Sequence, residues 1–383
     1  MAKLGEIATV QSGGTPARSK KEYWQDGCIP WVKISDIKDK YVKTTEEKIT
    51  EQGLNNSSAK IFSAGTILYT IFATLGETAV LDIDAATNQA IVGIMVTDKR
   101  VLPEFLYYYL VSQKENVVKM GRGVAQNNIN MALLRDFEVP IFEQKKQKIV
   151  IRNLERLDNL ILLRKQQLAK LDELVKARFV EMFGEPSSNP MGWLQTTVGA
   201  ECYYIKDGPH KSLTDVGMEN GYPFISVRNI VNGYIDFSTA KYISEADYKD
   251  AIKKCCPEKG DILYSKGGTT GIAKLVDIDI KFANWVHLAV LKFNHNEFNG
   301  AFFEKMLNCD YCYKQSQMLT KGIANRDLVL SAMAQIKIYK PPILLQNQFA
   351  TFVERVDQQK QTVQQSLEKL ELMKKALMQE YFG

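Results

Sequence analysis

Apolar residues recur at spacings of three and four over residues 143–183, a charged stretch without Gly or Pro until Gly184 and Pro186. The pattern predicts one long amphipathic helix with a coiled-coil seam. The seam residues are Leu154, Leu157, Ile161, Leu168, Leu171, Val175 and Met182. At about 1.5 Å per residue the helix would be roughly 60 Å long. Because so long a helix must bury its apolar stripe, the sequence also predicts a partner helix.

A second stretch, residues 346–382, repeats the pattern and supplies this partner. Its seam residues are Val353, Val356, Val363, Leu367, Leu370, Leu377 and Tyr381. When Phe183-Gly184 is aligned with Phe382-Gly383, Glu155-Arg156 aligns with Glu354-Arg355. Two unrelated amphipathic helices would share the heptad but not these polar identities. We therefore infer that the helices arose by duplication.

The remaining segments repeat in the same order as the helices. The matched segments are residues 30–37 with 223–230, 65–69 with 260–264, and 123–126 with 322–325. The predicted domains are residues 1–142, a central helix at 143–184, residues 185–345, and a C-terminal helix at 346–383. Within the first domain, strands are predicted at 29–34, 65–70, 79–82 and 137–142, and a helix at 102–119.

These patterns predict an α+β fold. Two duplicated mixed α/β domains are joined by two long helices that form an antiparallel coiled coil, related by a pseudo-twofold axis. Such a protein suits a target with two separated half-sites, as duplex DNA offers to twofold proteins.

Composition adds little to this picture. The chain has 383 residues, of which 45% are apolar and 24% charged, as in ordinary soluble proteins. A net charge of +5 permits a nucleic-acid partner without establishing one. Six Cys without a paired framework, no apolar leader at the start and no run long enough to span a membrane lead us to expect a cytoplasmic protein.

Several candidate chemistries are disfavoured. Gly267–Gly271 resembles a phosphate loop, but Ile272–Val276 is predicted to be a strand, whereas such loops open a helix. Cys309 and Cys312 have zinc-like spacing, yet their segment is predicted to be helical and no second well-spaced pair exists. The three His are scattered. The Asn-Pro-Pro-aromatic and Asp-Pro-Pro-aromatic motifs of amino-methyltransferases are absent. We expect no catalytic residues and no metal.

What remains is a set of polar loops whose Asn, Gln, Arg and Lys side chains suit base edges and whose Gly residues allow a backbone to approach phosphate. In the first domain the candidate DNA-binding residues are Ser12, Gly13, Gly14, Thr15, Arg18, Lys33, Thr70, Gln126, Asn127 and Asn128. In the second they are Lys206, His210, Lys211, Arg228, Asn229, Ser265, Lys266, Gly268, Thr269, Asn325 and Arg326. Each loop taken singly also fits a solvated turn.

Five features together resemble one known family. They are Ile29-Pro30-Trp31, Gly65-Thr66-Ile67-Leu68 with its echo at Gly260, the loop at 123–130, Val139-Pro140-Ile141, and the segment 183–193. The chain resembles, over essentially its whole length, the specificity (S) subunit of type I restriction-modification systems. Only the start of the long helices differs, where Lys340-Pro341-Pro342 stands against Val139-Pro140.

This resemblance implies two target-recognition domains that each read one half of a split DNA sequence. It also implies that the helix pair spaces the domains and docks two methyltransferase (M) subunits, which carry S-adenosylmethionine and methylate adenine. Motor-nuclease (R) subunits would join for cleavage, and no membrane and no cofactor would be bound by this chain itself.

The sequence also offers a docking surface and leaves alternatives open. Residues 160–163 carry more apolar surface than a two-helix seam can cover, so Leu160 and Leu163 are predicted to dock a partner. The alternatives are a specificity subunit of a related methyltransferase or nuclease system, a coiled-coil scaffold without DNA binding, and an enzyme whose motifs are unrecognised. The target bases cannot be read from the sequence, because readout combines side chains, water and DNA shape.

Overall fold

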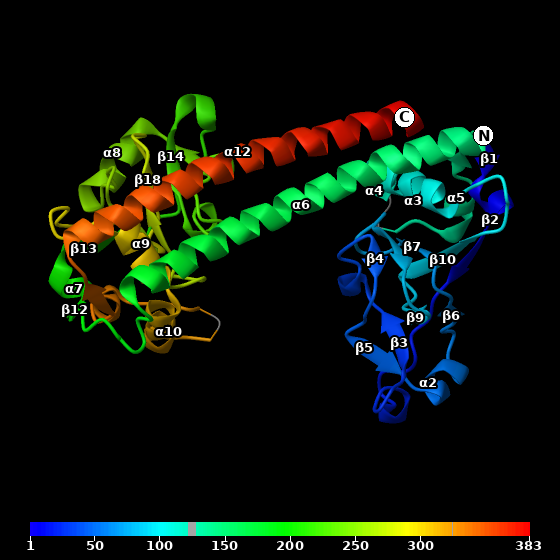
Figure 1. Ribbon diagram of the computed structural model, residues 1–383, viewed down its shortest axis with the longest axis horizontal. Coiled ribbons are helices and arrows are strands. Elements are labelled where there is room, and N and C mark those ends of the chain that lie inside the picture. Colours follow the sequence, from blue (N-terminus) through cyan, green and yellow to red (C-terminus); the bar gives the residue numbers. More distant parts are fainter. Residues whose placement is uncertain (122–127, 324) are drawn as a thin grey trace. The chain divides into compact units, whose positions relative to one another are not determined.

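The computed structural model describes residues 1–121, 128–323 and 325–383, which fold as two compact units (Figure 1). Unit 1 consists of Met1–Gln166 and Gln364–Gly383, and unit 2 of Gln167–Val363. Each unit contains one globular part and one segment of each long helix. The boundary between the units therefore runs through the helices rather than before them.

Two sheets and a small strand pair form the globular part of unit 1. The larger sheet has the order β2-β10-β7-β8-β4, antiparallel except for β4 and β8. The second has the order β5-β3-β9-β6, with β3 parallel to β9. β1 pairs antiparallel with β11. The strands are β1 Ala2–Lys3, β2 Ala8–Ser12, β3 Ile29–Val32, β4 Tyr41–Val42, β5 Glu47–Ile49, β6 Ile61–Phe62, β7 Ile67–Thr70, β8 Thr78–Leu81, β9 Ala85–Thr87, β10 Ile91–Val96 and β11 Glu138–Val139.

Unit 2 repeats this plan. Its larger sheet has the order β13-β19-β16-β17, its second sheet β15-β14-β18, and β12 pairs with β20. β14 is antiparallel to β15 and parallel to β18, as β3 is to β5 and β9. The strands are β12 Leu194–Thr197, β13 Cys202–Asp207, β14 Tyr222–Ile225, β15 Lys241–Ile243, β16 Ile262–Ser265, β17 Ala273–Leu275, β18 Ala283–Asn284, β19 Leu288–Phe293 and β20 Lys337–Lys340.

Short helices complete each unit, and several start at a side chain that satisfies free backbone N–H groups. Asn130 accepts from the N–H of Leu133 (2.8 Å) at α5, and Asn299 accepts from Ala301 (3.0 Å) at α9. Unit 1 has α1 Leu4–Ile7, α2 Glu51–Asn55, α3 Pro103–Ser112, α4 Lys114–Gly121 and α5 Met131–Arg135. Unit 2 has α7 Val198–Glu201, α8 Glu245–Lys254, α9 Gly300–Asn308, α10 Asp310–Leu319 and α11 Leu330–Met333. Single 3₁₀ turns are η1 Lys21–Tyr23, η2 Ile34–Asp36, η3 Met218–Asn220 and η4 Val227–Asn229.

Alternation along the central strands builds two apolar layers on opposite faces of each large sheet. In unit 1, Tyr69 packs in the cluster that contains Phe105 of α3, whereas its neighbour Leu68 packs toward the second sheet. In unit 2, Tyr264 and Leu263 divide in the same way. The long helices contribute to the first of these layers, so each globular part is attached to its helices by a continuous core.

The two long helices are α6 (Gln144–Phe183) and α12 (Ile343–Phe382). Half of the fourteen predicted seam residues are buried and the other half are half-buried; the buried ones are Leu154, Leu157, Val175, Val353, Val356, Val363 and Leu367. α6 starts one residue after the predicted position, and α12 starts three residues before it. Gly184, with φ of 76°, ends α6 in the left-handed conformation that glycine tolerates.

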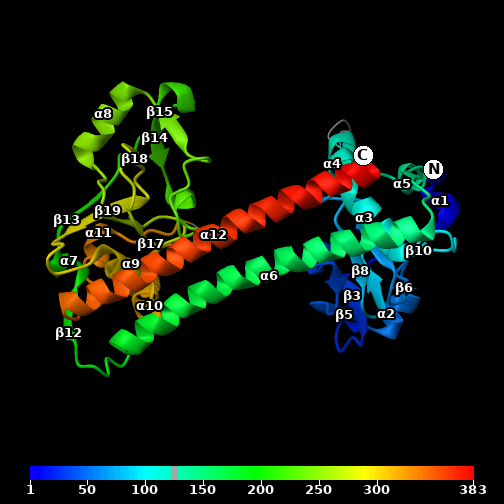
Figure 2. The same cartoon turned by 45° about the horizontal axis from the view of Figure 1, so that its top comes forward.

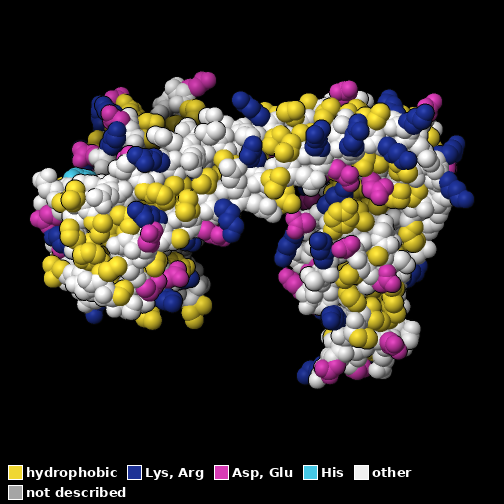
Figure 3. Space-filling view, in the orientation of Figure 1, with side chains coloured by type: hydrophobic (Ala, Val, Ile, Leu, Met, Phe, Trp, Pro, Cys, Tyr) yellow, Lys and Arg dark blue, Asp and Glu magenta, His cyan; other side chains and the backbone are white. Residues whose placement is uncertain are grey.

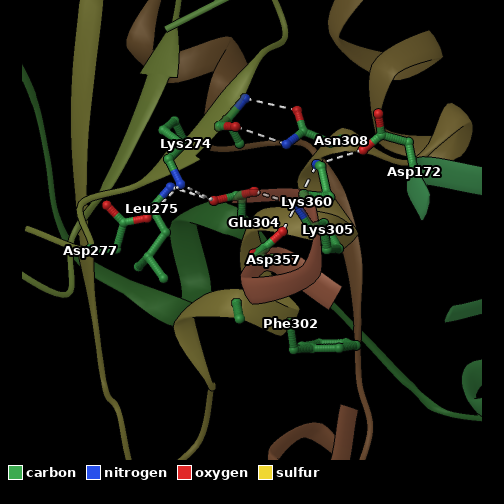
Figure 4. Close-up of polar contacts among 12 residues, drawn as sticks. Asp172, Lys274, Leu275, Asp277, Phe302, Glu304, Lys305, Asn308, Asp357 and Lys360 are labelled. Carbon is green, nitrogen blue, oxygen red and sulfur yellow. Dashed lines mark hydrogen bonds and ion pairs between the residues drawn. The ribbon is translucent and has the colours of Figure 1, made fainter. Parts of the chain in front are cut away.

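Within each unit the two helix segments run antiparallel. In unit 1, Asn153 donates to the hydroxyl of Tyr381 (3.1 Å), and Lys374 pairs with Asp158 (2.5 Å). In unit 2, Lys360 pairs with Asp172 (2.7 Å), as Figure 4 shows, and further along α6 Arg178 lies over the ring of Phe352, 5.9 Å from its centre. In both units a later position on α6 contacts an earlier position on α12, as the predicted antiparallel pair requires.

A buried glutamine ties the start of each long helix to the globular part. Gln147 of α6 accepts from the N–H of Leu102 (2.9 Å) and donates to the carbonyls of Arg100 (2.8 Å) and Phe142 (2.7 Å). Gln346 of α12 makes the same set of bonds with Asn299, Glu297 and Pro341. Because both amides are fully buried, the duplication has preserved a polar joint where apolar packing alone would leave backbone groups unpaired.

Unit 2 also buries a charge cluster between α9 and β17 (Figure 4). The carboxylate of Glu304 pairs with Lys305 (2.7 Å) and Lys274 (3.3 Å) and accepts from the N–H of Leu275 (2.8 Å). Burial alone would raise the pKa of Glu304, but the charges of Lys305 and Lys274 outweigh it and lower the pKa. The side-chain amide of Asn308 in α9 accepts from the N–H of Ala273 in β17 (2.9 Å) and donates to its carbonyl (2.8 Å).

The predicted fold class is confirmed, with local differences. The strands predicted at 29–34, 65–70 and 79–82 are β3, β7 and β8. The helix predicted at 102–119 is divided into α3 and α4 at Gln113. The strand predicted at 137–142 is only Glu138–Val139, because Pro140 has no N–H to donate to a ladder. Among the residues described, no helix is long and apolar enough to cross a membrane.

Candidate nucleic-acid interface

The same turn follows a central strand in each unit, between β7 and β8 and between β16 and β17. The N–H of Glu77 donates to the hydroxyl of Thr70 (2.9 Å), and the N–H of Ile272 donates to that of Ser265 (2.8 Å). Both hydroxyls belong to fully buried residues. Thr70 and Ser265, predicted to contact DNA, therefore shape the turns and do not face a ligand.

The tips of these turns face solvent. In unit 1 the tip comprises Phe72, Ala73 and Thr74, all exposed, and in unit 2 it includes the exposed Gly268 and Thr269. Ala73 and Gly268 occupy the same left-handed position, with φ of 60° and 69°. A residue with a Cβ rarely adopts this conformation. Unit 1 therefore keeps the shape of the turn although alanine prefers a negative φ.

A second loop lies beside each turn. The N–H of Ile129 donates to the carbonyl of Ile71 (3.1 Å), and the N–H of Leu328 donates to that of Lys266 (2.7 Å). Short antiparallel bridges join Phe72 to Asn128 and Gly267 to Asp327. Each unit therefore presents a turn and a loop side by side.

The predicted loop residues divide between these positions. Gly268 donates its N–H to the carbonyl of Arg326 (3.1 Å), and the Arg326 side chain donates to Gln317. Asn325 and Arg326 are exposed beside the unit 2 turn, and Asn128 is half-buried beside the unit 1 turn. Gln126 and Asn127 lie outside the described residues.

A third loop follows the first strand of each large sheet. A Cβ at Gly13 would lie 2.0 Å from the hydroxyl of Thr87, and one at Gly208 would lie 1.8 Å from the carbonyl oxygen of Asn284. Gly14 accepts from the indole N–H of Trp31 (3.0 Å). Gly13 and Gly14 are thus required for close packing and are buried, not free to approach phosphate. Ser12 and Thr15 are half-buried beside them, and Thr15 bonds to Gln89.

Lys266 joins the three loops of unit 2 internally. Its ammonium group lies 3.4 Å from the carboxylate of Asp207 at the end of β13 and 3.1 Å from that of Asp327 in the second loop. Only 6% of Lys266 is exposed, so its charge is neutralised within the fold. The predicted role of Lys266 in contacting DNA directly is not supported by this position, which is that of an organising residue.

The predicted cations of unit 1 are engaged with neighbours. Arg18 stacks over Trp24 at 3.7 Å from the ring centre and pairs with Glu47. Lys33 pairs with Glu46 and Glu47, each at 2.9 Å, and these hydrogen bonds raise the pKa of Lys33. Both cations are associated with the second sheet of unit 1, because Arg18 pairs with Glu47 of β5 and Lys33 follows β3 directly.

The predicted residues of unit 2 are more exposed. Lys206, His210, Lys211 and Arg228 all face solvent, although Lys211 pairs with Asp250 (3.2 Å) and Arg228 donates to the carbonyl of Thr239 (2.8 Å). Asn229 is the exception. It is 1% exposed and holds a loop through Asp236 and Thr239, so it is structural.

Sequence reasoning missed the exposed apolar side chains of these surfaces. Phe72 is 41% exposed at the unit 1 turn, because a Phe adjoining a buried strand looks like a core residue in the sequence. Met318 and Ile323 are 84% and 101% exposed near the unit 2 loop, beside the exposed Lys321. The repeat in the sequence could have identified Phe72 as a turn residue. Phe72 aligns with Gly267, so the second half has no apolar side chain at this position.

Across residues 1–121, 128–323 and 325–383, no group of three or more His, Cys, Asp or Glu side chains is placed to hold a metal ion. In each unit the turn lies beside the second loop, and in unit 2 Lys266 also ties the loop after the first strand to them. Together with the duplicated topology, these loops are the candidate recognition surface of each unit.

Comparison with known proteins gives the family. Residues 1–173 and 205–372 match the family described as Type I restriction modification DNA specificity domain. The chain belongs to this family, and its role is the recognition of a DNA sequence.

Curated relatives and solved structures agree. The MjaIX type I restriction enzyme specificity subunit of Methanocaldococcus jannaschii is 28% identical over 312 residues, 76% of this chain and 71% of that protein. The EcoR124I/EcoR124II specificity subunit of Escherichia coli is 26% identical over 163 residues, 41% and 40% of the two chains. The crystal structure of the S subunit from M. genitalium matches with a TM-score of 0.55 at 16% identity, covering 100% of this chain and 95% of that one. A chain from a study of complex assembly and conformational transition of the type I R-M system matches with a TM-score of 0.57 at 18% identity, covering 100% and 96%. The two structures show that the fold is shared.

Proposed function

We propose that each unit reads one half of a bipartite DNA target, using its turn, the loop beside it and the loop after its first strand. The observation that carries this proposal is the repetition of one arrangement in both units, down to the hydrogen bonds of Thr70 and Ser265. The residues at the exposed tips differ between the units, which is what two different half-sites require.

The surface chemistry suits this task. In unit 2, Asn325 and Arg326 combine an amide and a guanidinium, the groups that pair with adenine and guanine edges in the major groove. Lys206, Lys211 and Lys321 are exposed cations that would contact phosphates and fix the register. In unit 1, Phe72 and Thr74 occupy the corresponding tip, and an exposed Phe can contact a thymine methyl or enter a base step.

The helix segments supply the second half of the proposal. Leu160, Leu162 and Leu163 of α6 are 38%, 51% and 57% exposed outside the seam, and α12 adds the exposed Leu372 and Met373. Figure 3 shows apolar side chains interspersed with Lys and Arg along this helical region of unit 1. Because a solvated helix pair has no reason to keep such a surface, we propose that it docks partner subunits.

These partners are proposed to be two methyltransferase subunits that carry S-adenosylmethionine and methylate adenine, with motor-nuclease subunits joining for cleavage. In this assembly the present chain contributes recognition and spacing, and the partners contribute the chemistry. This division of roles is supported by the relatives, which are specificity subunits of type I restriction enzymes.

The direct test is binding to DNA with and without a methyltransferase subunit of the same type I system. Footprinting of the complex on its methylated sites should show two protected half-sites separated by an unprotected or sequence-independent gap. A single continuous specific site, or no specific binding when the partner is present, would contradict the proposal.

A further inference from the structure

A groove of about 350 Å³ lies in unit 1 between α4, α5, β11 and the last turn of α12. Figure 2 shows the C-terminal turns of α12 close to α4. Tyr109, Val117 and Phe382 give the groove apolar walls, and Met120 and Leu133 stand at its rim with 50% and 40% of their surface exposed. An open apolar groove of this size on a folded unit calls for an occupant.

The duplication shows what fills the corresponding place in unit 2. Phe183 aligns with Phe382, and each ring packs on an equivalent Phe of a short helix. Phe183 lies 4.7 Å from Phe302 of α9, and Phe382 lies 5.3 Å from Phe105 of α3, between ring centres. Beside Phe183, however, a space of only about 10 Å³ remains. Among the residues that the structure describes, the two units therefore present a filled and an unfilled copy of one site.

The filling material is a short peptide segment with a Pro and a Trp. Pro186 is buried, and the indole N–H of Trp193 donates to the carbonyl of Phe183 (2.8 Å). Asn189 closes the loop, donating to the carbonyl of Trp193 and accepting its N–H, both at 2.9 Å. Residues 184–193 thus form a compact cover, held to the end of α6 by the bond from the Trp193 indole to the Phe183 carbonyl.

In unit 2, side chains also bridge the space between α10 and β20. In unit 1 the corresponding space, between α4 and β11, is part of the groove. Gln315 accepts from the N–H of Lys337 (2.9 Å) and donates to its carbonyl (3.0 Å), and Tyr311 stacks on Tyr339. In unit 1, Asn116 of α4 instead donates to Gln113, the residue between α3 and α4 (3.1 Å). Glu138 of β11, the counterpart of Lys337, is left on the groove.

The rim charge indicates the occupant's polarity. Asp136 and Glu138 line the groove and are exposed, and in the described part of the chain Lys3 is the cation that forms an ion pair with this rim, 2.8 Å from Asp136. Two carboxylates against one ammonium favour a segment that brings its own positive charge. We propose that the groove binds a partner polypeptide segment with a Pro and an aromatic anchor, as in residues 184–193, flanked by Lys or Arg. The linker of a second copy does not qualify, because its Pro186 is already buried in its own unit 2.

The test uses the full chain and a fluorescent synthetic peptide with the sequence of residues 184–193, alongside a version with Glu185→Lys. In fluorescence anisotropy the Lys peptide should bind several-fold more tightly at low salt, and Trp193→Ala in either peptide should weaken binding at least tenfold. Leu133→Lys or Met120→Lys in the protein should weaken binding at least tenfold. The control Leu174→Lys, at a leucine of α6 that is 46% exposed, should leave it unchanged.

Placement is tested separately from affinity. Benzoylphenylalanine in place of the peptide's Trp should crosslink to α4, α5 or the end of α12, read by mass spectrometry. The proposal is overturned if the peptides do not bind, if crosslinks map elsewhere, or if Leu133→Lys and Met120→Lys proteins that melt normally bind like wild type. Sedimentation showing dimers abolished by Leu133→Lys would also overturn it, by assigning the groove to a second copy. None of these readouts involves DNA, so they are independent of the proposed function.

Discussion

Replacing Gln147 or Gln346 by Leu should loosen one unit from its long helix while sparing the other. Leu has nearly the volume of Gln, so the substitution removes the amide without opening a large cavity. In each case three backbone groups lose their partner: one N–H and two carbonyls. Both glutamines are fully buried, so water cannot replace the amide without local opening.

The magnitude follows from that count. A buried backbone group left without a partner costs about 1–3 kcal/mol. Three such groups, with partial relaxation, give a loss of roughly 3 kcal/mol in the stability of the affected joint. At about 1.4 kcal/mol per tenfold change in an equilibrium constant, local opening should become on the order of 100-fold more frequent.

Hydrogen exchange read by mass spectrometry reports such opening region by region. Gln147→Leu should accelerate exchange in α3 and the first turns of α6 and leave α9 unchanged. Gln346→Leu should accelerate exchange in α9 and the first turns of α12 and leave α3 unchanged.

Exposed glutamines in the same turns are the matched controls. Gln144 makes one exposed bond, to the carbonyl of Lys99, so Gln144→Leu should change stability by about 0.5–1 kcal/mol at most. Gln348, exposed in the first turns of α12, provides the matching control for unit 2 as Gln348→Leu. Equal acceleration in both units from one variant, or an effect no larger than that of the controls, would refute the joint as the source of attachment.

Three further predictions concern partner docking, pH and spacing. Leu160→Glu with Leu163→Glu should abolish co-purification with the methyltransferase subunit without changing the melting of the isolated chain; retained stoichiometric co-purification would count against this docking surface. Glu304→Gln should destabilise unit 2 by about 1–3 kcal/mol at neutral pH, because Lys274 keeps its pair with Asp277 (2.9 Å) but loses the buried carboxylate. Since the folded pKa of Glu304 is lowered from 4.5, its contribution is present above that pH and is lost as pH falls through the lowered value, so thermal unfolding of wild type and variant should converge in acid and a constant difference would refute the assignment. Inserting one heptad after Leu171 and another after Leu370 should lengthen the gap between half-sites by about three base pairs, from roughly 10 Å of added helix and 3.4 Å per pair, while an active variant with the original gap would show that the helices do not set it.

The long helices and the duplication could be predicted from the sequence because their signals are local. The heptad spacing that includes Leu154 and Leu157 can be recognised within a few helical turns. The polar identities around Glu155 and Glu354 exclude a chance match. The order of strands followed from the same alignment, since a repeated sequence folds into a repeated topology.

The fate of individual loop residues could not be predicted in this way, because it is decided by chain segments far apart in sequence. Lys266 looks like a DNA contact until Asp207 and Asp327 are brought to it from two other loops. Thr70 looks like an exposed hydroxyl until Glu77 folds back onto it. Gly13 looks permissive until Thr87 is placed against it by the second sheet. Burial by distant segments turned each of these from a candidate contact into a structural residue.

The central claim, that each unit reads its own half of the DNA target, is tested most directly by mapping methylated sites genome-wide in cells carrying paired variants. One variant carries Asn325→Ala and Arg326→Ala in unit 2, and the other carries Phe72→Ala and Thr74→Ala in unit 1. Losing a base contact typically costs about 1–3 kcal/mol, enough to relax a position roughly 5- to 100-fold. Each variant should relax bases in one half-site only, a different half for each, with the gap unchanged. Relaxation of the same half-site by both variants, or of both half-sites by either one, would contradict the account.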